Sequence, residues 1–233
     1  MKQFIIHKIF WIVFALTCLA TQVTQAQEDL MAELSKSMTR EQDFVYATFK
    51  GTRVINLHTI ETVGKKNLEF RIAHRFGDFS SGADNLWGLD GPATIQFHFD
   101  YGITDRLTVG VGRASYNKIF DGFAKYNLLR QTTDNRMPVS LTLMGSINVT
   151  PGDQEIGNRT AYLTQAMIAR KLNSRLSLQL TPIFIHYNLA FSYGDKNDIF
   201  AIGLTSRYKI SNHAALTGEY IYRLNNYSAN FDA

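Results

Sequence analysis

The sequence predicts an all-β fold, an antiparallel meander transmembrane β-barrel of about 10–12 strands. Three observations lead to this prediction. From residue 45 onward, apolar and polar residues alternate with a period of two, which is typical of strands with one apolar and one polar face. Most of these runs exceed the roughly 5–6 residues of soluble strands and reach the roughly 9–11 that cross a bilayer. Short polar turns alternate with longer loops, as in outer-membrane barrels.

The N-terminus predicts a cleaved signal peptide over residues 1–26. Lys2 and Lys8 precede an apolar run at residues 9–20, and a small residue, Ala26, follows at the expected cleavage point. The apolar run is shorter than the roughly 20 residues that a membrane-spanning helix needs. We therefore expect an exported protein.

Residues 27–43 predict a short helical or mobile leader, because Leu30, Leu34 and Met38 recur at helical spacing. The barrel domain is then expected over residues 44–233. Its charge is nearly balanced: the whole chain has 24 basic and 20 acidic side chains, and two of the basic ones lie in the signal peptide. Since no basic cluster is present, the composition argues against a nucleic-acid partner.

Ten strands are expected. They lie near residues 45–59, 66–76, 92–104, 106–117, 119–130, 137–149, 160–171, 174–187, 198–210 and 213–224.

Alternation alone does not tell which face of the barrel is apolar. In "ATIQFHFDYGI" (residues 93–103), Ile, Phe and Tyr alternate with Gln, His and Asp. Glycines at 110, 112 and 203 share the polar face, which favours a polar face that lines a narrow lumen, and aromatic residues at the strand ends resemble the interfacial girdles of membrane barrels. The residues predicted to line the lumen are Glu69, Arg71, His98, Asp100, Lys125, Arg207, Lys209, Glu219 and Arg223.

The lengths of the connections predict which of them share one end of the barrel. The tight turns "TDR", "NSR" and "SNH" alternate with longer loops at 77–91, 150–158 and 188–197. This topology leaves an odd number of strands after residue 66, whereas bacterial barrels have an even number. We therefore expect either that at least one strand is missing at the C-terminus, or that residues 45–59 lie in the lumen and not in the wall.

Two segments resemble a known family. "HRFGD" (residues 74–78) and "YGITDRLTVGVGR" (residues 101–113) are the most specific parts of a similarity that extends over about residues 44–224. The sequence resembles an uncharacterised family of Gram-negative outer-membrane β-barrel proteins, a domain of unknown function. The resemblance implies a cell-envelope barrel with a cleaved signal peptide and implies no activity.

Catalytic and metal-binding motifs are not recognised. "GVGRAS" (residues 110–115) faintly resembles a nucleotide loop, but it lies in a strand and no helix follows to hold a phosphate. The histidines lack a metal-ligand spacing. We therefore expect no enzyme activity and no cofactor. In the first long loop, Leu86 and Trp87 are the exposed apolar candidates for binding a partner.

The leading functional hypothesis is a barrel in the outer membrane of a Gram-negative bacterium, surrounded by outer-membrane lipid, that acts as a narrow pore or as a structural envelope protein with a charged lumen. One alternative is a binding module whose loops hold a ligand or an envelope protein partner. A second alternative is a soluble secreted β-barrel that carries a lipid inside.

Overall fold

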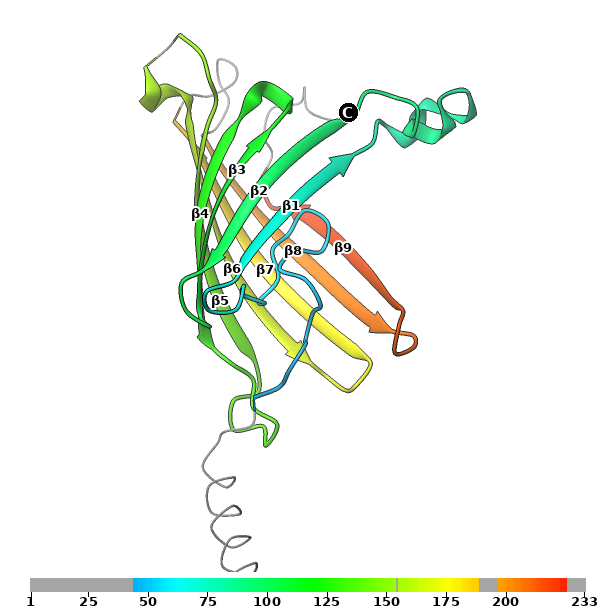
Figure 1. Cartoon of the computed structure of the whole chain (residues 1–233), viewed down its shortest axis with the longest axis vertical. Coiled ribbons are helices and arrows are strands. Elements are labelled where there is room, and N and C mark those ends of the chain that lie inside the picture. The colour runs from blue at the N-terminus through cyan, green and yellow to red at the C-terminus, as the bar shows by residue number, and fades with distance from the viewer. Residues whose placement is uncertain (1–43, 154, 189–196, 226–233) are drawn as a thin grey trace, which may run out of the picture. The chain divides into compact units, whose positions relative to one another are not determined.

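In the described part of the chain, one antiparallel sheet of nine strands makes up the fold (Figure 1). The computed structural model describes residues 44–153, 155–188 and 197–225. Each strand is hydrogen-bonded to the next one along the chain, so the predicted all-β antiparallel meander is confirmed. The strands are β1 (Leu68–Arg75), β2 (Thr94–Gly102), β3 (Leu107–Ala114), β4 (Phe120–Leu129), β5 (Ser140–Val149), β6 (Thr160–Lys171), β7 (Leu176–Tyr187), β8 (Asp198–Lys209) and β9 (Ala215–Arg223).

Nine of the ten expected strands are present, with ends shifted by a few residues. The expected strand at 45–59 is wrong, because that stretch makes only isolated bridges, Phe44 to Thr132 and Arg53 to His58. Its backbone groups are instead hydrogen-bonded by side chains of the sheet, as described below. The predicted signal peptide (1–26) and leader (27–43) lie outside the described residues.

The two faces of the sheet differ sharply in exposure. Along β2, Phe97 and Phe99 are 44% and 49% exposed, whereas His98 and Asp100 are 0% and 1% exposed. The apolar rows therefore lie on the convex outer face and the polar rows on the concave inner face. An apolar surface that extends over all nine strands is far larger than the patches that monomeric soluble proteins expose.

The connections lie at two ends of the sheet. At one end, the turn side, are residues 103–106, 130–139, 172–175 and 210–214. At the other, the loop side, are residues 76–93, 115–119, 150–153, 155–159, and residues 188 and 197 next to the ends of β7 and β8. The three predicted tight turns share the turn side. The connections at 130–139 and 115–119 are both longer than the expected strand ends left room for, and 115–119 is still short for the loop side.

Short 3-10 helices occur in the loop-side connections. They are η1 (Phe79–Ser81), η2 (Ala83–Gly88), η3 (Tyr116–Lys118) and η4 (Ile156–Arg159). Within the described part of the chain, no helix is long and apolar enough to cross a membrane.

Residues 44–67, here called the inner segment, lie against the inner face and lead into β1. Figure 1 shows this segment in blue, crossing the concave side of the sheet between β1 and β9. It contributes to two apolar clusters. Phe49 and Ile60 pack with Phe123, Met144, Met167 and Ala169, and Leu57 packs with Ile183 and Ala201. The core therefore lies between the inner segment and the sheet.

The first and last strands form the edges of the sheet. Among the described residues, β1 pairs only with β2, and β9 pairs only with β8. The gap between these two edges is the side across which the inner segment runs.

Candidate functional site: the inner face and its segment

A charged network connects β1, β2 and β4 on the inner face. Glu69 and Arg71 face Asp100 and His98 across the β1–β2 ladder. The Arg71 guanidinium lies 3.2 Å from the Asp100 carboxylate and 3.4 Å from that of Glu69. His98 Nε2 lies 3.4 Å from the carboxylate of Asp121 on β4. A buried charge is tolerated when it is paired in this way.

The other predicted lumen-lining residues share the inner side of their strands. Lys125 is completely buried, Arg207 is nearly so, and Lys209 is partly buried. Glu219 lies on the last strand and is partly buried, while Arg223 is exposed near its end.

Glu219 binds the backbone of the inner segment. The backbone amides of Ile55, Asn56 and Leu57 all donate to its carboxylate, over distances of 2.9–3.3 Å. A carboxylate that accepts several backbone N–H groups satisfies donors that no strand neighbour satisfies. This side chain therefore holds the tip of the inner segment at β9.

Gln179 on β7 acts as a second anchor. Its Oε1 accepts from the Ile60 amide at 3.0 Å, and its Nε2 donates to the His58 carbonyl at 2.8 Å. One side-chain amide thus replaces the paired N–H and C=O contacts that a neighbouring strand would make.

Further anchors come from other strands. Val63 N donates to Thr108 Oγ1 on β3 (2.9 Å), Lys125 Nζ on β4 donates to the Glu61 carbonyl (2.5 Å), Thr142 Oγ1 on β5 donates to the Ile60 carbonyl (3.2 Å), and Lys171 Nζ on β6 donates to the Tyr46 carbonyl (2.9 Å). With Thr52 Oγ1 donating to Glu69 on β1 at 3.0 Å, the inner segment is bonded to seven strands.

Glycines make room for this packing. A Cβ atom on Gly102 would collide with the carbonyl oxygens of Gly64 and Val63, and one on Gly203 would collide with Leu57. Close backbone approach is one reason for glycine within a strand.

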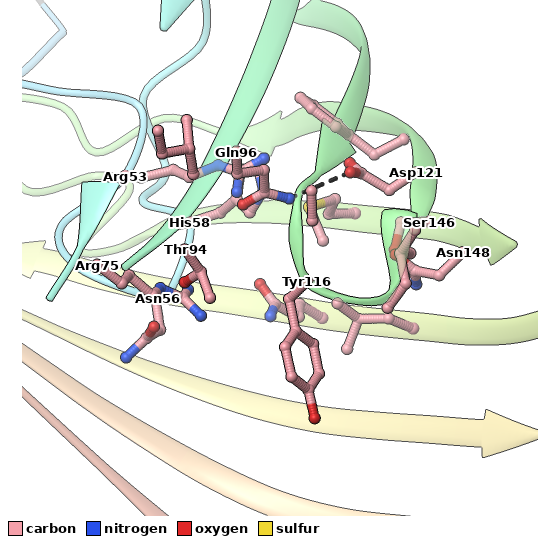
Figure 2. A pocket seen from close by; sticks show the side chains of 17 residues that line it. Arg53, Asn56, His58, Arg75, Thr94, Gln96, Tyr116, Asp121, Ser146 and Asn148 are labelled. Atoms are coloured by element: carbon pink, nitrogen blue, oxygen red, sulfur yellow. Dashed lines mark hydrogen bonds between the residues drawn. The ribbon is translucent and has the colours of Figure 1, made fainter. Parts of the chain in front are cut away.

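A cavity lies on the loop side of the inner segment (Figure 2). This loop-side cavity has a volume of about 300 Å³. Arg53, Asn56 and His58 of the inner segment line it together with inward residues of β1 to β6. Figure 2 shows Arg53 and Arg75 on one side of the cavity and Ser146 and Asn148 on the other.

The predicted loop candidates lie apart from this cavity. Leu86 and Trp87 belong to η2 and are 55% and 51% exposed. Both have positive φ angles, which bulky residues rarely adopt. The preceding helix η1 is capped by Asp78, and hydrogen bonds from Ser80 lower the pKa of this exposed carboxyl.

The described residues contain no group of three or more His, Cys, Asp or Glu side chains placed to hold a metal ion.

A comparison with protein families identifies the chain. A sequence model of the DUF5777 family, described as a membrane-bound β-barrel domain, matches residues 49–232. The chain belongs to this family. No curated protein and no solved structure matches it. The resemblance to a membrane β-barrel family of unknown function is confirmed, and membership argues against a soluble lipid carrier. The DUF5777 match begins within the inner segment, so this segment is part of the family's domain.

Glu69, Lys125 and Glu219 anchor the inner segment and were among the predicted lumen-lining residues, but other anchors were missing from the predicted site. Gln179 and Thr108 occur in the same period-two pattern as the predicted residues, but they carry no charge and so did not stand out. The pattern identifies the inner face, and it does not identify which inward residues contact a segment that is distant in sequence.

Proposed function

We propose that this protein is an outer-membrane β-barrel whose narrow pore is shut at rest by the inner segment. The observation that carries the proposal is the set of hydrogen bonds between the inner segment and inward side chains of seven strands: its backbone is bonded to six of them, and the Thr52 side chain is bonded to β1. Apolar side chains on the outer face suit contact with lipid tails. The predicted signal peptide and the short turns at one end support an outer-membrane location.

The closure rests on polar contacts as well as on apolar packing. Each hydrogen bond contributes a modest net free energy, about 1 kcal/mol, because the unfolded segment makes hydrogen bonds to water instead. Non-covalent contacts of this kind hold the segment inside the closed barrel, and the segment can leave without the cleavage of a covalent bond.

Planar-bilayer recording tests the proposal. We expect the wild-type full chain to show no conductance steps, and Gln179→Ala/Glu219→Ala to show them, because it removes two anchors of the segment. Silence in both proteins would reject the pore and leave a structural envelope role. Steps in the wild type would reject closure by the segment.

Location is tested by fractionation. The protein should remain in the membrane pellet after carbonate washing and should show heat-modifiable migration in detergent gels, which reports a closed membrane barrel. Release by carbonate would contradict an integral barrel.

A second candidate function is a binding module for an envelope protein partner. The exposure of Leu86 and Trp87 favours it, since Trp87 also stacks on Phe79 (ring centroids 6.4 Å apart) and so presents an ordered apolar surface. Pull-down from solubilised envelopes with wild type and Leu86→Ser/Trp87→Ser tests it. If both proteins retain the partner equally, Leu86 and Trp87 do not bind it, and the binding-module proposal for this loop is contradicted.

A further inference from the structure

The loop-side cavity contains unpaired cationic groups. Within the described residues, neither Arg53 nor Arg75 has a side-chain hydrogen bond or an ion pair, and Arg53 Nε is buried without a partner. The contact that the Arg53 guanidinium does make is with the ring of Phe123, at 5.7 Å from its centroid. Two guanidinium groups therefore line one small cavity, and in the part of the chain that the structure describes neither is within ion-pairing distance of a carboxylate.

The carboxylate in the cavity lining is already engaged. Asp121 accepts a hydrogen bond from Gln96 Nε2 at 3.1 Å, and its other oxygen lies 3.4 Å from His98 Nε2. The net charge of the residues that line the cavity is thus positive. The N–H groups of Arg53 and Arg75 remain available to donate hydrogen bonds to a ligand.

Two further polar atoms in the lining lack partners among the described residues. Gln165 and His58 are each only 4% exposed, and Gln165 Oε1 and His58 Nδ1 make no hydrogen bond. Buried polar atoms without partners are rare, because desolvation is not repaid. A ligand that carries both acceptors and a donor would satisfy the arginines and Gln165 together.

We infer that the loop-side cavity binds a small oxyanion that also carries a hydroxyl group, such as hydrogen phosphate or the singly protonated form of a phosphate monoester. Its oxygens accept from Arg53 and Arg75, whose planar forks suit phosphate geometry. Its hydroxyl donates to Gln165 Oε1. The volume, about 300 Å³, lies at the lower end of small-molecule sites, and this site does not depend on whether the barrel conducts.

Isothermal titration of the purified full chain in detergent tests the inference, with inorganic phosphate, sulfate and glucose as probes at constant ionic strength. Phosphate and sulfate carry the same charge near pH 8, but only phosphate carries a hydroxyl. We expect phosphate to bind more tightly than sulfate, and glucose not to bind. Absence of phosphate binding, or equal binding of glucose, would overturn the inference.

Variants locate the binding. Arg53→Gln and Arg75→Gln should each weaken phosphate binding about tenfold or more, as expected for lost hydrogen bonds to a charged group. The matched control is Arg136→Gln on the turn side, where Arg136 pairs with Asp134 at 3.0 Å; it should bind phosphate like the wild type. An equal loss in the control would assign the effect to overall charge and overturn the site.

Gln165→Leu tests the donor contact. It should bring the affinities for phosphate and sulfate close together while leaving sulfate binding unchanged. An unchanged preference would contradict the role of Gln165. Heat-modifiable migration confirms that each variant is folded.

A phosphate could also belong to a lipid headgroup. Soluble dihexanoyl phosphatidic acid, added as a competitor, distinguishes the two sources. If it displaces phosphate, the oxyanion site is supported with a lipid as its source; if it does not, the site is supported with a free solute as its source.

Discussion

Single glycines on the inner face determine how closely the inner segment can approach the sheet. We predict that Gly102→Ala displaces the segment near residues 63–64, because the added methyl group would collide with the carbonyl oxygens of Val63 and Gly64. In liposomes, trypsin should then cut the segment faster after Lys50 or Arg53 than it cuts the wild type.

The matched control for this substitution is Gly145→Ala on β5, where an added Cβ atom meets nothing within 4 Å. It should leave cleavage at the wild-type rate. Equal protection in both variants would mean that the close approach at Gly102 is not needed to hold the segment.

Glu219 is a second single residue on which the position of the inner segment depends. Replacement by alanine leaves the amides of Ile55, Asn56 and Leu57 without their acceptor. Hydrogen bonds to a charged group contribute roughly 1.5–3 kcal/mol, so hydrogen exchange at these amides should accelerate about tenfold or more in Glu219→Ala. Glu155→Ala, in the exposed β5–β6 loop, serves as the control and should not change their exchange.

At the scale of elements, each strand is expected to tolerate charge differently on its two faces. Leu143 on β5 points outward and is exposed. An arginine in its place should destabilise the folded barrel in lipid by about 2–4 kcal/mol, because it must lie among hydrocarbon tails.

Urea titration in liposomes, followed by heat-modifiable migration, measures this effect. The control is Leu172→Arg, an exposed position in the β6–β7 turn, where the cost near the interface is about 0–1 kcal/mol. Equal midpoints for the two variants would contradict an outer face in lipid.

The strands were the predictable part of the structure. A period of two is a local property, so β6 at residues 160–171 coincides with its prediction and other strands differ by a few residues. The expected strand at 45–59 failed for the opposite reason. Its amides at 55–57, and the next one at Ile60, donate to Glu219 and Gln179. These two residues are more than a hundred positions away, and no local pattern encodes such contacts. The same holds for the loop-side cavity, where Arg53 and Gln165 meet only in three dimensions.

For the whole molecule, two kinds of contact predict two stages of unfolding. The strands are held by continuous backbone ladders, whereas the inner segment is held by side chains and two small apolar clusters. We predict that urea first exposes the amides of residues 44–67 to exchange and unfolds the sheet only at higher concentration.

Leu57→Ala should shift only the first stage to lower urea, since Leu→Ala in a packed cluster costs about 2–5 kcal/mol. Hydrogen exchange resolved by peptide measures the first stage, and heat-modifiable migration measures the second. A single shared midpoint would show that the segment and the sheet unfold as one unit.

Anchors such as Glu219 and Gln179 form hydrogen bonds with main-chain atoms, which are present whatever the side chain. These contacts therefore constrain the backbone path of the inner segment more than its amino-acid sequence. Arg53, Asn56 and His58 line the cavity, and we expect their side chains to be less constrained by the anchors. Substitutions at these lining positions would change which solute the cavity prefers, and the nine strands would stay as they are.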